Sequence, residues 1–264
     1  MNSIKKIKGY VFSVPKAGTY LMSEFLQQIG SQSTGWHISL NQYLDTLHFD
    51  NLTNKQTPSQ TKKERIYIAS FRQIPVGKHA FGHLSPLYVP PPILQRDYKI
   101  LCAKRNPKEV LISEFIDFRY RRSDVAFVSK KNVPDSIKAF EIYMTDHAHV
   151  IKNICQNFVL LEEMAVNPIY QSLVGDQSFY FLDFKKFLSS EQGPEIARKV
   201  SDFFGAHLTP EGAKMAWQAA LDADNKTKSA DAEIDIPRDQ FWSSVASQVY
   251  TQLGFPELSS RLGY

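Results

Sequence analysis

The sequence predicts an α/β protein with a central parallel β-sheet flanked by helices on both faces. Short runs of β-branched and aromatic residues alternate with longer segments whose apolar residues have helical spacing. Two of these runs each lead through a short polar turn into a helix, as in parallel sheets. The length of 264 residues fits one core, so we expect a single domain over residues 1–264.

The first strand-to-helix unit lies at the N-terminus. Residues 9–14, GYVFSV, predict a strand, and residues 20–26 predict a helix after a Pro-Lys-Ala-Gly turn. Residues 31–64 are rich in Ser, Thr, Asn and Gln and predict irregular surface structure. Two further short strands are expected at 66–71 and 79–84.

A second strand-to-helix unit begins at residue 98. Residues 98–104, YKILCAK, predict a buried strand, and Arg105-Asn106-Pro107 opens a helix with an apolar stripe. The apolar spacing over 134–163 is mainly helical, and 178–184 predicts a core strand. Helices are expected at 194–204, 210–222 and 238–253, and a polar loop at 222–235.

Composition and charge exclude several classes of protein. The formal charge of +4 would attract a polyanionic small molecule but does not require nucleic acid, which we do not expect as a partner. Cys102 and Cys155 form neither a metal pattern nor a disulfide framework, and no ligand cluster predicts a metal. We find no signal peptide and no transmembrane segment, so we expect a cytoplasmic protein; a homodimer is left open.

The turn after the first strand has the parts of a phosphate site. A loop that leaves a strand and enters a helix presents free backbone N–H groups and the positive helix end. In Pro15-Lys16-Ala17-Gly18-Thr19, the glycine permits close approach, the threonine offers a hydroxyl and the lysine supplies a mobile charge. The GxxxxGK[ST] spacing of ATPases is absent, and alone the motif is better explained as an ordinary turn.

The second strand-to-helix junction strengthens this interpretation. Arg105 follows a predicted strand at the end where open parallel sheets bind ligands, and Ser113 lies two turns into the next helix. An arginine there can make a bidentate contact with a phosphate. In isolation, each residue is better explained without a ligand: Arg105 by a surface ion pair and Ser113 as a serine on a helix face. Together the two junctions indicate a doubly phosphorylated nucleotide.

Three segments resemble the motifs of sulfotransferases that use 3′-phosphoadenosine 5′-phosphosulfate (PAPS). SVPKAGTYLMSEFL resembles their 5′-phosphosulfate loop, usually YPKSGTTWL, and AKRNPKEVLISEFIDF resembles their 3′-phosphate segment, usually ARNPKDVAVSYYHF. Between them, FGHLSPLYVPPPIL resembles KTHLPxxLLP. The resemblance implies a P-loop NTPase-like sulfotransferase fold, PAPS as donor, 3′-phosphoadenosine 5′-phosphate (PAP) as product and no metal. It also implies a small-molecule, lipid or glycan acceptor.

The resemblance also assigns roles to residues of the two phosphate segments. It implies that Lys16 contacts the bridging oxygen and the sulfuryl group, while Arg105 and Ser113 hold the 3′-phosphate. Tyr20 stands where the family usually has a second Thr or Ser. Gly18 and Thr19 are implied to hold the 5′-phosphate, and the donor-binding residues expected in this segment are Pro15, Lys16, Ala17, Gly18, Thr19 and Tyr20.

His83 matches the catalytic base of the family, and the chemistry of the reaction supports this match. An acceptor hydroxyl must lose its proton as its oxygen attacks sulfur, and histidine titrates near neutral pH. The family's Arg-Lys-Gly segment is missing; Lys226 and Lys228 are candidates for a lid, although a solvated loop is an equal alternative. The other histidines are expected to be structural: His37, His48, His79, His147, His149 and His207.

The expected mechanism is in-line displacement at sulfur, driven mostly by positioning and electrostatic stabilisation. Two other functions stay open. A nucleotide-dependent kinase ranks behind because no Walker loop or Asp-based magnesium site is present. A catalytically silent nucleotide-binding scaffold is motivated by Tyr20 and by the missing Arg-Lys-Gly segment.

Overall fold

The computed structural model of the protein describes residues 7–38, 73–83, 98–122, 125–174, 179–223 and 234–264. In this part of the chain a five-stranded sheet forms, and every pair of neighbouring strands is parallel. Its order is β2 (Gln32–His37), β3 (Lys78–His83), β1 (Lys8–Ser13), β4 (Tyr98–Lys104) and β5 (Phe179–Asp183). The expectation of a parallel α/β sheet is confirmed.

The central position of β1 follows from its composition. Tyr10, Val11 and Phe12 are buried, and a strand that is buried on both faces needs a continuous apolar run. β1 pairs with β3 on one side and β4 on the other. A Cβ at position 9 would lie 2.8 Å from the Cβ of His79 on β3, which is too close for two carbon atoms, so the close pairing of β1 with β3 favours glycine there.

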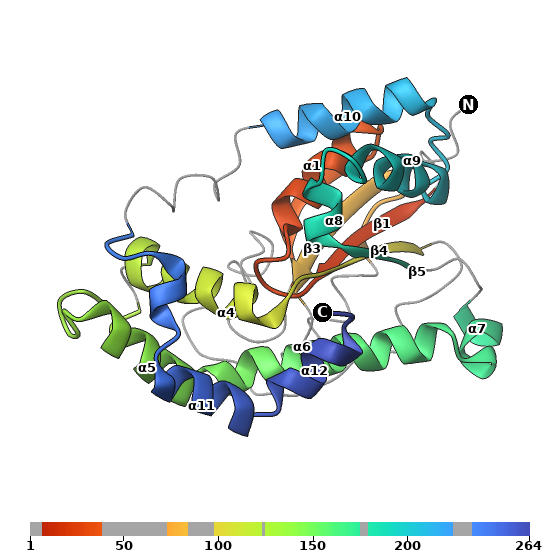
Figure 1. Ribbon diagram of the computed structural model, residues 1–264. Coiled ribbons are helices and arrows are strands. Elements are labelled where there is room, and N and C mark those ends of the chain that lie inside the picture. The colour runs from red at the N-terminus through yellow and green to blue at the C-terminus, as the bar shows by residue number, and fades with distance from the viewer. Residues whose placement is uncertain (1–6, 39–72, 84–97, 123–124, 175–178, 224–233) are drawn as a thin grey trace.

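Helices cover both faces of the sheet, as Figure 1 shows. One layer contains α1 (Thr19–Gln28), α8 (Phe184–Leu188), α9 (Gly193–Phe203) and α10 (Pro210–Asp222). The other contains α6 (Ala148–Ala165), α7 (Pro168–Val174) and α12 (Phe255–Arg261). Beyond the carboxyl ends of the strands lie α4 (Pro107–Ile116), the π-helical turn η3 (Asp117–Arg121), α5 (Ser136–Asp146), the 3₁₀ turn η5 (Arg238–Phe241) and α11 (Ser244–Gln252).

Several single elements differ in detail from the expectations, and one expectation is untested. Strand β2 lies within 31–64, where irregular structure was expected. The sequence did not predict it because QSTGWH is polar and lies partly exposed at the edge of the sheet. The helical segment 134–163 divides at His147 into α5 and α6. The helix expected at 238–253 is a 3₁₀ turn followed by α11. The strand expected at 66–71 lies outside the described residues.

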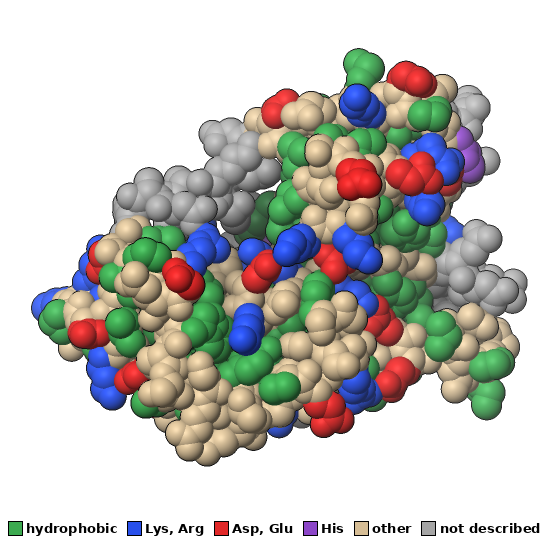
Figure 2. Space-filling model, viewed as in Figure 1, with side chains coloured by type: hydrophobic (Ala, Val, Ile, Leu, Met, Phe, Trp, Pro, Cys, Tyr) green, Lys and Arg blue, Asp and Glu red, His purple; other side chains and the backbone are tan. Residues whose placement is uncertain are grey.

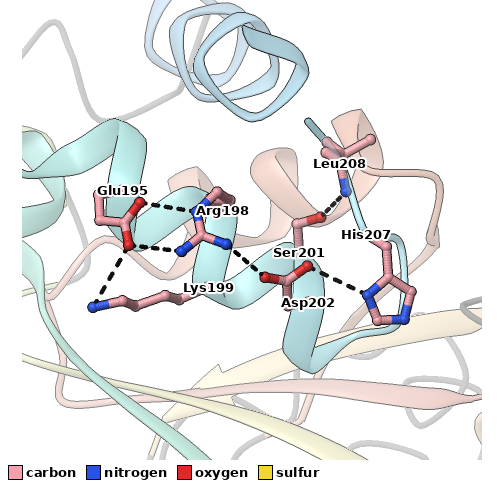
Figure 3. A network of polar contacts seen from close by, with 7 residues as sticks. All are labelled: Glu195, Arg198, Lys199, Ser201, Asp202, His207 and Leu208. Atoms are coloured by element: carbon pink, nitrogen blue, oxygen red, sulfur yellow. Dashed lines mark hydrogen bonds and ion pairs between the residues drawn. The ribbon is translucent and has the colours of Figure 1, made fainter. Parts of the chain in front are cut away.

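A local network of charges covers the exposed side of α9 (Figure 3). Arg198 contacts Glu195 at 2.9 Å and Asp202 at 3.1 Å, and Asp202 also contacts His207 at 3.3 Å. This end of α9 lies near the amino edge of the sheet, since Lys99, the second residue of β4, places its Nζ 4.8 Å from the Phe203 ring. The network is therefore remote from the carboxyl ends of the strands.

Across the described residues, none of the helices combines the length and the apolar character that crossing a membrane requires.

Candidate active site

The register of the sheet brings the predicted site segments together. Ser13, the last residue of β1, pairs with His83 at the end of β3 and with Ala103 near the end of β4. The predicted phosphate loop begins at Pro15, two residues after Ser13, and Arg105 follows β4. The connection after β1 leads to the β2 side of the sheet and the connection after β4 leads to the β5 side, and open α/β sheets bind ligands where neighbouring strands lead to opposite sides.

The backbone of the loop has an unusual conformation. Lys16 has φ 60° and Gly18 has φ 78°, both in the left-handed region. A Cβ on Gly18 would lie 2.0 Å from the ring of Phe184, the first residue of α8. Only glycine meets both requirements, while Lys16 holds a conformation that costs free energy in a non-glycine residue.

The helices α1 and α4 both begin at this edge, and their N-termini differ. In α4, the Asn106 side chain accepts a hydrogen bond from the Lys108 N–H at 2.9 Å, which caps the helix. In α1, the N-cap residue is Gly18, no side chain caps the helix and the first turn has no acidic residue. The positive end of α1 is thus the one that suits an anion.

Hydroxyl groups connect the loop to His83. Thr19 Oγ1 lies 2.6 Å from Ser13 Oγ, and Ser13 Oγ lies 3.4 Å from His83 Nδ1. Ser13 and Thr19 are buried, which gives the hydroxyl pair a fixed geometry. A group held by the loop is therefore coupled to the predicted base through two side chains.

The surroundings of His83 favour its neutral form. Burial lowers the pKa of His83 well below its ordinary value, and the nearby charges of His37 and Lys16 lower it further. The hydrogen bond with Ser13 acts in the opposite direction and is the weaker effect. A neutral imidazole can accept a proton, and the neutral form is the one that the predicted role of His83 as a base requires.

Lys16 and Arg105 are tied to each other and to acidic partners. Arg105 Nη1 donates to the Lys16 carbonyl at 2.9 Å, and Arg105 Nε pairs with Glu109 at 2.9 Å. The Arg105 guanidinium also lies 5.6 Å from the ring centroid of Phe184. Lys16 Nζ contacts Asp117 Oδ1 at 3.0 Å. Figure 2 shows Lys and Arg side chains, interspersed with acidic ones, in a band across the middle of this face.

The remaining predicted residues are placed as follows. Pro15 and Ala17 are buried in the loop, and Ser113 lies partly exposed two turns into α4. The Tyr20 ring lies beside β2 and β3, where it stacks on His37 with ring centroids 6.3 Å apart and meets Phe81 edge-on at 5.3 Å. Lys226 and Lys228 lie outside the described residues.

Four residues at this edge were missed by the sequence interpretation. Phe184 and Asp117 come from segments far from the loop in sequence, and only the tertiary contacts identify them. Ser13 could have been noticed as a polar residue at the end of an apolar strand. His37 was expected to be structural, yet its ring lies 5.0 Å from that of His83.

Within the described residues, no group of three or more His, Cys, Asp or Glu side chains could hold a metal ion.

Comparison with known proteins shows which family the chain belongs to. Residues 8–248 match the sulfotransferase domain family, whereas no curated protein sequence matches the chain. The structure of mouse sulfotransferase SULT7A1 complexed with PAP is similar to it, with a TM-score of 0.56, 14% identity and coverage of 95% of this chain and 86% of that one. At this identity the likeness shows the fold alone.

Two structures of retinol dehydratase are also similar. The complex with androsterone and inactive cofactor PAP has a TM-score of 0.47 and 15% identity, and it covers 83% of this chain and 65% of its own. The complex with retinol and PAP has a TM-score of 0.47, 16% identity and coverage of 80% and 63%. This chain thus spans less than two thirds of the retinol dehydratase chains. Because the family match covers most of the sequence, the chain belongs to the sulfotransferase domain family.

Proposed function

We propose that the protein transfers the sulfuryl group of PAPS to a hydroxyl or amine of an acceptor, with His83 as the base. The observation that carries this proposal is the meeting of three elements at one edge of the sheet. The loop after Ser13, His83 beside it and Arg105 after β4 lie at the ends of three adjacent strands. Membership of the sulfotransferase domain family supports the same assignment.

The donor site would use both strand-to-helix junctions. The uncapped N-terminus of α1, together with Gly18 and Thr19, suits the 5′-phosphate. Arg105 and Ser113 would hold the 3′-phosphate, and the arginine is positioned by its hydrogen bond to the Lys16 carbonyl. The 5′-phosphate and the 3′-phosphate, on opposite sides of the ribose, would therefore have separate binding groups. A nucleotide with only a 5′-phosphate would leave the contacts of Arg105 and Ser113 unused.

The residues at the junction divide the chemistry between them. His83 accepts the acceptor's proton as the acceptor oxygen or nitrogen bonds to sulfur. Lys16 and the loop amides stabilise the charge on the bridging oxygen, which keeps the electron pair of the sulfur–oxygen bond when that bond breaks. The hydroxyls of Thr19 and Ser13 hold the loop and the base in a fixed relation. Catalysis would be mostly positioning.

The acceptor is a small molecule, lipid or glycan that presents its nucleophile to His83. Rings of Tyr20, His37 and Phe81 pack against one another beside this base. Tyr20 is 40% exposed whereas His37 and Phe81 are buried, so the Tyr20 ring is the part of this cluster that supplies an exposed aromatic surface. An acceptor with an apolar face next to its hydroxyl or amine would suit that surface.

Calorimetric titration of PAP into the wild-type protein and the Arg105→Ala variant tests the donor site, with adenosine 5′-monophosphate as control ligand. We expect binding that depends on both the 3′-phosphate and Arg105, with a loss of about tenfold or more in the variant. Absence of binding by folded wild-type protein would contradict the proposal.

Two further assays separate the alternatives that the sequence left open. Transfer from PAPS to a panel of phenols, alcohols and amines would establish the enzyme, and loss of transfer in His83→Ala would establish the base. Binding of PAP with no transfer to any acceptor would favour a silent scaffold, and turnover of ATP with magnesium would favour a kinase.

A further inference from the structure

The side chain of Lys16 is held by a carboxylate from a distant part of the chain. Lys16 Nζ lies 3.0 Å from Asp117 Oδ1, and both side chains are about one-fifth exposed, at 20% and 21%. The Lys16 carbonyl is held separately by Arg105. The β4–α4 unit therefore fixes both ends of this lysine, with one partner before the helix and one after it.

Asp117 occupies a particular place relative to the predicted donor site. It begins the π-helical turn η3, and its N–H donates to the Ser113 carbonyl, so it lies one turn beyond Ser113. Residues four apart share a helix face. The Lys16 ammonium group is thus drawn toward the α4 face that carries Ser113. π-Helical turns inserted after α-helices occur frequently at functional sites.

The Lys16 ammonium group cannot pair fully with both Asp117 and the anionic donor. A phosphate or phosphosulfate would compete with the Asp117 carboxylate for the same ammonium group, and the two anions would repel each other. Lysine can change partners easily because its charge lies on a flexible four-carbon chain. If Lys16 moved to the donor, the negative charge of Asp117 would still have a cationic partner, because Arg121 Nη1 lies 3.7 Å from the same carboxylate oxygen.

We propose that Asp117 is a positioning residue that holds the Lys16 ammonium group in the nucleotide-free protein and yields it to the donor when the donor binds. This inference rests on the proposed function, because it takes Lys16 as a donor contact. The consequence is an exchange of ion pairs: Lys16 passes from a carboxylate to a phosphate oxygen, while Asp117 keeps Arg121. Because the ion pair between Lys16 and Asp117 must break when the nucleotide binds, it lowers the affinity for the nucleotide. Asp117 takes no part in the transfer step itself.

A double-mutant cycle with PAP as the probe tests this exchange. Calorimetry would compare the wild type with Asp117→Asn, Lys16→Met and the double variant. We expect Asp117→Asn to tighten PAP binding by about threefold to tenfold when Lys16 is present and by less than about twofold when it is absent. An equal gain in both backgrounds would show simple repulsion by Asp117 and overturn the proposal, as would weaker binding by Asp117→Asn.

Kinetics and matched variants complete the test. Because a contact made only in the free protein affects ground-state binding, Asp117→Asn should lower KM for PAPS and leave kcat unchanged. Asp117→Glu keeps the charge and should bind PAP as the wild type does. Asp202→Asn removes the same charge from the remote network in Figure 3 and should leave PAP affinity unchanged. Failure of the wild type to bind PAP would contradict the proposed function and this inference together, whereas binding without the gain contradicts the inference alone.

Discussion

The two ends of β3 each carry a histidine, and their surroundings differ. His79, near the start of the strand, is fully buried, with Ser23 Oγ 2.9 Å from Nε2 and Ser31 Oγ 2.9 Å from Nδ1. His83, at the carboxyl end, has the longer 3.4 Å contact with Ser13 and lies beside His37 and near Lys16. Burial lowers both pKa values. The start of β3 therefore gives its histidine two close hydroxyl partners, whereas the carboxyl end places His83 at the edge where we propose that the donor binds.

The largest expected effect is the loss of transfer in His83→Gln. Glutamine cannot accept and release a proton near neutral pH, so we expect kcat to fall by about 10²- to 10⁴-fold. PAP affinity should stay near that of the wild type, because the phosphate contacts are made elsewhere. Product formation from PAPS, measured beside PAP calorimetry, checks both. Full activity in the variant would remove the distinction between the two histidines.

The second effect concerns the acid stability of the other end of β3. Burial lowers the pKa of His79 from 6.5 to about 4 in the folded protein. The unfolded chain therefore binds a proton first as the pH falls, so stability is complete above pH 6.5 and decreases down to about pH 4. This group alone would remove up to about 3 kcal/mol of unfolding free energy. Urea unfolding at a series of pH values measures it.

The variant His79→Leu tests whether that histidine is only structural. Leucine leaves the buried Ser23 and Ser31 hydroxyls without the imidazole, so we expect a loss of about 1–3 kcal/mol in unfolding free energy at neutral pH. The difference from the wild type should shrink toward pH 4, and transfer per folded molecule should be retained. A selective loss of kcat in stable protein would contradict the structural role.

The smallest effect is expected from His37→Phe. Phenylalanine can keep the ring contacts with Tyr20 and Phe81 but removes the charge that lowers the pKa of His83. The pKa of His83 should rise, so the acidic limb of the kcat–pH profile should move to higher pH. The rate on the plateau should change little. An unchanged limb would show that His37 does not influence the base.

Local signals in the sequence determined much of this protein. Continuous apolar runs predicted β1, β4 and β5, and Pro107 marked the start of α4. The glycine of the loop and the arginine after β4 were identified because strand-to-helix junctions have recognisable chemistry. These features depend on residues that are neighbours in the chain.

The tertiary structure decided what distant segments bring to the same edge. The polar edge strand β2 was missed because its pairing with β3 outweighs its weak apolar pattern. Phe184 explains why residue 18 must be glycine, and Asp117 sets the position of the Lys16 ammonium group. The sequence by itself determined most of the helices and strands and the two strand-to-helix junctions, because hydrophobic periodicity and turn chemistry act over a few residues. Packing between elements decided which His, Asp and Phe side chains meet there, because those contacts join segments up to about 170 residues apart.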